Sequence, residues 1–185
     1  MSGKKNDAVS PVIGIMLMLV VTILIAAVVS TFAGGIADTK SKTPVATISG
    51  EYSQSRGMII YHNGGDVLSP IDIEVVTQLT RVWGPASDST TYYANKSVMD
   101  TNGTIWAPVD KQYITKRAFQ PGESIYIAPE NLGQVQCNVN YASPLAKTSA
   151  SSYQNSVNVG RPFIVKIIDK NANQVIGQTE VTIQS

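Results

Sequence analysis

One long apolar run lies near the N-terminus of the chain, and short apolar stretches separated by polar ones follow it. Residues 8–37 contain no charged side chain, and within residues 12–29 the only hydroxyl group belongs to Thr22. A run that is apolar on every side, with no polar stripe, is typical of a helix surrounded by lipid or by other apolar helices. The pattern therefore predicts one long apolar helix in residues 8–37.

Signals for the start and end of this helix flank the run. Ser10 is a good N-cap residue, and Pro11 suits the first helical position, where a missing N–H costs nothing. Gly34 and Gly35 suit the C-terminal end. A helix over residues 11–33 would be roughly 35 Å long, which is enough to cross the hydrocarbon core of a bilayer.

Polar segments lie on both sides of the apolar run. Residues 1–7, "MSGKKND", carry Lys4 and Lys5, whereas residues 38–44, "DTKSKTP", form a polar connector. Because the positive flank is N-terminal, we expect the N-terminus to lie on the cytoplasmic side of the membrane and the C-terminal domain on the outer side.

The rest of the chain, residues 45–185, reads as a single domain of short strands. The apolar or alternating stretches are residues 45–49, 58–62, 71–77, 124–128, 134–139, 162–169 and 180–184. Turn residues separate many of these stretches, and no long amphipathic helix appears after residue 37. This pattern predicts a β-sandwich or barrel. The polar stretches at residues 84–104 and 143–158 are expected to be exposed loops.

The composition of the chain excludes some classes of function and of covalent structure. The chain has 185 residues and a formal net charge of +1, which argues against a nucleic-acid partner. A single cysteine, Cys137, excludes an intrachain disulfide, and we expect it to pack as a small apolar group.

Candidate catalytic or metal-binding residues are few. His62, Asp66 and Asp72 lie close in sequence, but "HNGGD" at residues 62–66 reads as a tight turn in which an aspartate binds local backbone N–H groups. One histidine and scattered acids form a weak ligand set. We therefore expect no enzyme activity, no cofactor and no metal.

Two other groups of residues suggest surface chemistry. The sequons "NKS" at Asn95 and "NGT" at Asn102 are possible N-glycosylation sites in a domain that faces outside. Four tyrosines fall in polar stretches, where they could form contacts with other molecules or pack as ordinary surface residues. They are Tyr92, Tyr93, Tyr141 and Tyr153.

Residues 1–37 allow three interpretations: a secretory signal peptide, a plain membrane anchor, or a helix that is retained for assembly. The apolar stretch is too long for the first. The segment "DAVSPVIGIMLMLVVTILIAAVVSTFAGG" resembles the N-terminus of archaeal type IV pilins, and "AVSPVIG" at residues 8–14 is its most specific part. The segment "IIYHNGGDVLSPIDIEV", residues 59–75, resembles the start of the extracellular domain of such pilins.

This resemblance implies a cleaved leader of the class III type. A prepilin peptidase would remove Met1–Asp7 by cutting between Asp7 and Ala8, and the helix would remain on the mature protein. The implied fold is mainly β with one long N-terminal α-helix, followed by an immunoglobulin-like β-sandwich head.

The resemblance also implies a function. The precursor would lie in the cytoplasmic membrane and then polymerise with copies of itself into an extracellular filament used for adhesion. The implied partners are the prepilin peptidase, a pilus assembly ATPase and a membrane platform protein.

Small residues on the helix are candidates for packing between subunits. Bacterial type IV pilins carry a glutamate at the place of Val12, so here packing and not an ion pair would set the register. The small residues recur at four-residue spacing, which allows helix backbones to approach closely. They are Gly14, Thr22, Ala26, Ser30 and Gly34.

Several alternative functions remain at this stage. The chain could be the subunit of an archaeal swimming filament, an archaellin, which shares the same plan. It could be a minor pilin that starts or caps filaments. An alternative of another class is an extracellular binding protein or enzyme whose helix stays in the membrane as an anchor.

Overall fold

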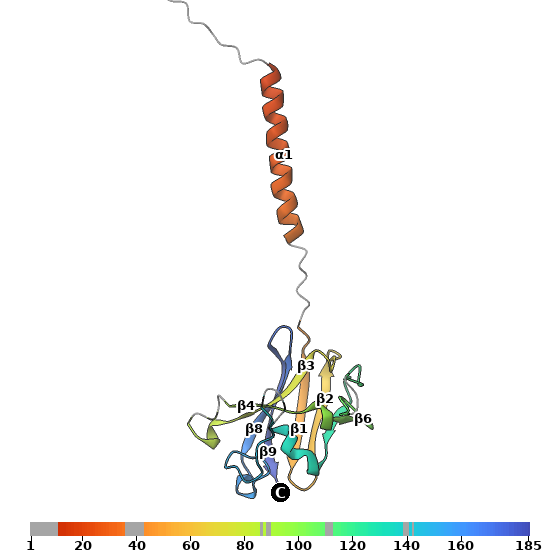
Figure 1. Cartoon of the computed structure of the whole chain (residues 1–185), viewed down its shortest axis with the longest axis vertical. Coiled ribbons are helices and arrows are strands. Elements are labelled where there is room, and N and C mark those ends of the chain that lie inside the picture. The colour runs from red at the N-terminus through yellow and green to blue at the C-terminus, as the bar shows by residue number, and fades with distance from the viewer. Residues whose placement is uncertain are drawn as a thin grey trace, which may run out of the picture. The chain divides into compact units, whose positions relative to one another are not determined.

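The computed structural model describes residues 11–35, 43–85, 87, 90–109, 113–138, 141 and 143–185. The chain divides into two compact units, Met1–Lys42 and Thr43–Ser185. The first contains one helix and the second contains the strands, as Figure 1 shows. We describe each unit separately and refer to residues 43–185 as the head.

Helix α1 spans Pro11–Gly35, so it begins at the predicted proline and ends at the predicted glycine pair. The structure assigns an exposed surface to every side chain from Pro11 to Phe32. This stretch is long and apolar enough to cross a membrane, and it lies near the N-terminus. The helix thus buries none of the side chains from Pro11 to Phe32 within its own unit.

The head contains nine strands and several short 3-10 helices. The strands are β1 (Ala46–Ser53), β2 (Gly57–Gly65), β3 (Ile73–Leu79), β4 (Thr91–Tyr93), β5 (Asp100–Thr101), β6 (Thr104–Ile105), β7 (Ser124–Ile127), β8 (Pro162–Asp169) and β9 (Gln174–Gln184). The described 3-10 helices include η1 (Arg81–Trp83), η3 (Lys96–Val98), η4 (Pro129–Val135) and η5 (Ser156–Asn158).

All nine strands belong to one sheet in the order β4-β3-β8-β9-β1-β2-β7-β5-β6. Neighbouring strands are antiparallel except β1 and β9, which pair in parallel at Tyr52–Ile183 and Ser53–Gln184. This parallel contact joins two antiparallel halves, and the sheet curls so that side chains of both halves meet in one core. The structure therefore confirms one long N-terminal helix followed in the chain by a mainly β head, and the head is a continuous curled sheet.

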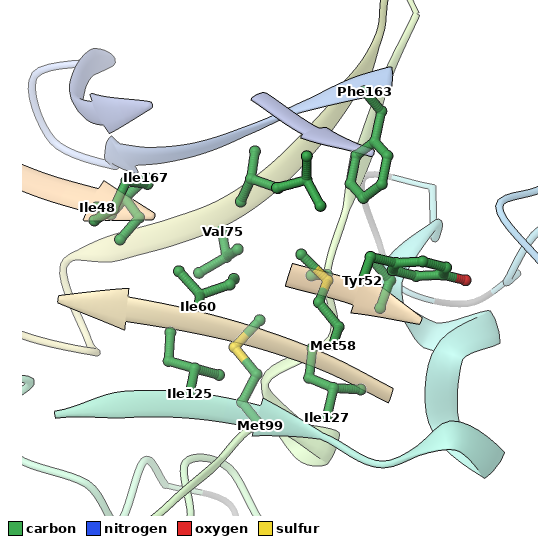
Figure 2. Close-up of a cluster of buried hydrophobic side chains, with 14 of the residues drawn as sticks. Ile48, Tyr52, Met58, Ile60, Val75, Met99, Ile125, Ile127, Phe163 and Ile167 are labelled. Atoms are coloured by element: carbon green, nitrogen blue, oxygen red, sulfur yellow. The ribbon is translucent and has the colours of Figure 1, made fainter. Parts of the chain in front are cut away.

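The core forms between the two halves of the sheet. Ile60 on β2 and Ile125 on β7 lie in the same cluster as Val75 on β3 and Ile167 on β8, as Figure 2 shows. All four are buried, as their alternating positions along the strands require. Burial of this apolar surface is the main force that holds the curled sheet together.

An aromatic group closes one side of the core. The Tyr153 ring stacks on Phe163 with centroids 4.0 Å apart, and Tyr52 meets Phe163 edge-on at 5.5 Å. Trp83 meets Tyr153 edge-on at 5.7 Å. These geometries are the favourable ones for aromatic pairs.

The predicted tight turn at residues 62–66 is wrong. Strand β2 continues to Gly65, which pairs with Ala46, and only Gly65 of the two glycines there has a positive φ, 106°. The chain reverses instead between Ser53 and Gly57. Gly57 has φ of 97°, and a Cβ there would lie 2.3 Å from the Ile127 carbonyl oxygen, so only glycine fits this turn.

The predicted strand at residues 134–139 is also wrong. The 3-10 helix η4 occupies Pro129–Val135, and of the described residues in this stretch only Cys137 makes isolated bridges, to Tyr93 and to Pro144. Leu132 and Val135 are both buried, since a spacing of three residues places them on one face of a 3-10 helix. Cys137 is buried, as the sequence predicts.

The two stretches expected to be exposed loops contribute to the core, so this expectation is wrong in part. Met99 and Thr101 are buried in the first stretch, and Tyr153 and Asn158 in the second. Side-chain oxygens of Asn95 and Asn155 cap the 3-10 helices η3 and η5. Such short capped turns direct single apolar residues inward without producing a periodic pattern in the sequence.

Candidate filament-forming helix and surface sites

The small residues of α1 form a slowly winding strip. A step of four residues along a helix turns by about 400°, so Thr22, Ala26, Ser30 and Gly34 drift by only about 40° from one to the next. Gly14 lies two turns before Thr22, and a Cβ placed there would meet nothing within 4 Å. The strip is a shallow surface on which the backbone of a second helix could approach closely.

Two hydroxyl groups on α1, those of its threonines, donate hydrogen bonds within the helix. Thr22 Oγ1 donates to the Leu19 carbonyl at 2.9 Å, and Thr31 Oγ1 donates to the Ala27 carbonyl at 2.6 Å. Because these two donors are satisfied internally, they add little cost when the helix lies in lipid. The surface of α1 is therefore compatible both with lipid and with apolar neighbours.

His62, Asp66 and Asp72 have structural roles in the head. The buried His62 ring lies with Nε2 3.0 Å from the Asp66 carbonyl oxygen and tilts against Phe119. Asp66 Oδ2 accepts a hydrogen bond from the Val45 N–H at 3.0 Å, and exposed Asp72 accepts from Asn171. Within the described ranges, no three or more His, Cys, Asp or Glu side chains lie together as a possible metal site.

The two sequons lie in different environments. Asn95 is half-buried, its Oδ1 accepts from the Ser97 N–H at 3.0 Å, and its Nδ2 donates to Gln134 Oε1 at 3.2 Å. Asn102 is exposed in the turn between β5 and β6, where its φ is 54°. Its Nδ2 donates to Glu123 Oε1 at 3.3 Å.

The tyrosines in the polar stretches separate into core and surface groups. Tyr153 is fully buried and Tyr92 packs against the core, so Tyr153 cannot serve as a surface contact. Tyr93 and Tyr141 are half-buried and meet edge-on at 6.2 Å. Tyr93 also borders an open hollow of about 460 Å³, together with Tyr92 and Leu145.

The sequence analysis missed a buried lysine, Lys96. Its Nζ donates to the Pro70 carbonyl oxygen at 2.8 Å. Burial, and then the charge of Lys170, lower the pKa of Lys96 to about 8, although Glu74 and Asp72 oppose this shift. No sequence signal marks this residue, because a lysine in a polar stretch normally lies in water.

The cleavage residues Asp7 and Ala8 lie outside the described residues, so the structure gives no account of the leader. The comparison with known protein families does reach them. Residues 7–48 match the family model of the archaeal type IV pilin N-terminal domain, a range that includes all of α1 and the start of β1. No curated protein matches the chain. The N-terminal region of this chain is that of an archaeal type IV pilin, and a β-rich head follows it.

Proposed function

We propose that this chain is a structural subunit of an archaeal type IV pilus, which polymerises through α1 into a surface filament. The observation that carries this proposal is the helix itself. It has the pilin N-terminal sequence, it is apolar all round, and its described side chains are exposed from Pro11 to Phe32. A pilin of this family is a structural protein and not an enzyme.

The physical basis of assembly is a change of surroundings for one helix. Before assembly α1 spans the cytoplasmic membrane, and the head lies outside. In the filament, neighbouring helices replace the lipid. Packing of small residues supplies specificity there, and contact with water would cost about 25 cal/mol for each Å² of apolar surface. A filament in water is therefore stable because separation of its subunits would expose the apolar helices to water.

Removal of the leader would prepare the helix for this transfer. A cut between Asp7 and Ala8 removes Lys4, Lys5 and Asp7, which together carry a net positive charge. The two lysines hold the N-terminus of the precursor on the cytoplasmic side of the membrane. Prepilin peptidase would make the cut, and an assembly ATPase and a membrane platform protein would then extract the subunit.

Mass spectrometry of sheared surface filaments tests this proposal. We expect an abundant subunit whose mature N-terminus is Ala8. An N-terminus at Asp38, or a protein found only in the membrane fraction, would contradict it.

We assign the filament to adhesion rather than to swimming. The support for this choice is the phrase "AVSPVIG", which is typical of the adhesive branch of these filaments. Deletion of the gene should reduce attachment to surfaces and leave swimming unchanged. Loss of swimming with normal attachment would identify the chain as an archaellin instead.

Asn102 is the better of the two glycosylation candidates. It is exposed on a turn, whereas both polar atoms of the Asn95 side chain are engaged and the residue is half-buried. The substitution Asn102→Gln should remove one glycan mass from the mature filament protein, and Asn95→Gln should not. The opposite pattern in intact-mass spectra would reverse this assignment.

A further inference from the structure

The head has two ends, which the strand pairings define. One end, which we call the entry end, is where β1 starts: Ala46 pairs there with Gly65, and nearby Ile73 pairs with Asp169. The opposite end, which we call the far end, holds the turn between β1 and β2 and the pairing of Leu79 with Phe163. Figure 1 shows the hairpin between β8 and β9 at one end of the head and the C-terminus at the other.

Apolar side chains are exposed at the entry end. Val45, Val67, Ile71 and Val175 are between 47% and 61% exposed. Backbone contacts hold these positions together, since the Asp66 N–H donates to the Val45 carbonyl and the Lys170 N–H donates to the Asp72 carbonyl. Exposed apolar groups gathered at one place are typical of an interaction surface.

The same end is acidic. Its described segments are residues 43–45, 66–72, 116–123 and 169–175, and they contain three aspartates, Glu123 and three basic residues. Two of the basic residues are in ion pairs, since Lys116 pairs with Glu123 at 2.6 Å and Lys170 pairs with Glu74 at 3.5 Å, and the third is Arg117. The aspartates are Asp66, Asp72 and Asp169. Asp66 and Asp72 are exposed, so their charges face solvent beside the apolar group.

The far end has the same apolar character and the opposite charge. Val82, Val157 and Val159 are between 43% and 71% exposed there. The described segments of this end, residues 54–56, 81–85, 129–133 and 147–161, contain four basic side chains and one acidic side chain, Glu130. The basic residues are Arg56, Arg81, Lys147 and Arg161.

The surface of the far end is also hollowed. Gln54, Lys147 and Asn155 border an open hollow of about 580 Å³ beside Val157. Arg161 lies over the Trp83 ring at 5.3 Å, and Arg56 Nη2 donates to Gln184 Oε1 at 3.0 Å. Both arginines are therefore held in place on the head, which favours a defined contact over a general electrostatic attraction.

We propose that heads stack end to end in the filament, with the entry end of one copy docked on the far end of a second copy. This inference rests on the proposed pilin function. Opposite charges select this contact, because two entry ends or two far ends would repel each other. A contact between two different surfaces is heterologous, and it generates an open chain when the rotation does not close. The valines of both ends exclude water from the centre of the contact.

Charge exchange in the full-length chain tests the stacking. Asp72→Arg reverses a charge at the entry end, and Arg56→Glu reverses one at the far end. Each single variant should reduce the yield of sheared filaments about fivefold, which corresponds to about 1 kcal/mol at each subunit contact. The chain that carries both substitutions should recover most of the yield, because the two ends are again complementary at these positions. A higher NaCl concentration should also reduce the yield of wild-type filaments, because salt screens the charges of the two ends.

A matched control separates a local effect from a change in total charge. Glu180→Arg makes the same change as Asp72→Arg at an exposed position within β9, where Glu180 pairs with Ile164 and lies outside the segments that form either end, and it should leave the yield unchanged. The fluorescence of Trp83 and Trp106 follows unfolding of the head in every variant. If a reversed charge destabilises the head, Asp72→Asn and Arg56→Gln supply milder changes with the same expected direction.

Each possible outcome decides between the proposals. Single variants that match Glu180→Arg in yield, or a double variant that assembles worse than either single one, would overturn the stacking and leave the pilin function intact. Absence of filaments from the wild-type chain in an assembling host would overturn both.

Discussion

At the scale of single residues, Lys96 is the unusual group, because its amine is buried beside the Pro70 carbonyl. With a folded-state pKa of about 8 and an ordinary value of 10.5, the unfolded chain binds more protons than the folded chain between these pH values. The free energy of unfolding should therefore rise with pH in this window. From pH 8 to 9.5 we expect an increase of about 1.5 kcal/mol.

Denaturant unfolding of the full chain in detergent micelles measures this effect, because both tryptophans lie in the head and report its unfolding. In Lys96→Met the rise should disappear. A pH dependence that persists in this variant would assign the effect to another group. The window ends at pH 9.5 because of Tyr52 and Tyr92, whose pKa burial raises above the ordinary value of 10.0. Above about pH 10 these tyrosines ionise more readily in the unfolded chain, so the free energy of unfolding falls as the pH rises further.

Tyr153 provides a second test at this scale. Its ring is fully buried between Phe163 and Trp83, so truncation leaves a large cavity in the aromatic group. Tyr153→Ala should lower the free energy of unfolding by about 3–5 kcal/mol, the usual cost for a buried aromatic ring. Val157→Ala, at a side chain that is mostly exposed, is the control and should change it by less than about 0.5 kcal/mol. Equal effects of the two substitutions would refute the core position of Tyr153.

At the scale of elements, α1 and the long strands follow from local pattern. The run from Pro11 to Gly35 has no charged side chain, so it lies in lipid or among apolar neighbours, where only a helix satisfies its backbone hydrogen bonds. Its prediction therefore needs no tertiary information. Strands β2 and β8 have enough β-branched and alternating residues to be predicted in the same way.

The elements that sequence reasoning misses are those fixed by tertiary contacts. The stretch "QVQC", residues 134–137, alternates like a strand, but η4 extends into it as far as Val135, and Leu132 and Val135 are buried through a three-residue spacing. The buried position of Tyr153 depends on Phe163, which is ten residues further along and on a different element. The charged ends of the head are likewise invisible in the sequence, because segments far apart in the chain form each of them.

The small-residue strip of α1 leads to a prediction about the helix as an element. Ala26 lies on the strip, and its neighbour Ala27 faces about 100° away. Ala26→Ile should block close approach of helices and strongly reduce filament yield, whereas Ala27→Ile should assemble nearly as well as the wild type. Both variants should reach the membrane equally, because isoleucine is more apolar than alanine. Western blots of membrane and sheared-filament fractions measure both quantities.

Equal assembly of the two helix variants would show that the strip is not the packing face. Failure of both variants to enter the membrane would place the effect before assembly. The adjacent alanines make this comparison well matched, since the substitution is identical and only the direction around the helix changes.

At the scale of the whole molecule, the two units have separate tasks. The helix supplies an apolar surface from Pro11 to Phe32, and the head supplies a β fold with an acidic and a basic end. The first feature explains why the chain would polymerise, and the second sets how heads would follow one another. Both proposals involve contacts between copies of the same chain.

The most direct test of the account is a helical reconstruction, by electron cryomicroscopy, of filaments isolated from cells. We expect a core built from residues 11–35 of many subunits packed against one another, with the heads outside. A core formed by any other segment, or filaments in which residues 11–35 are absent, would contradict the central claim.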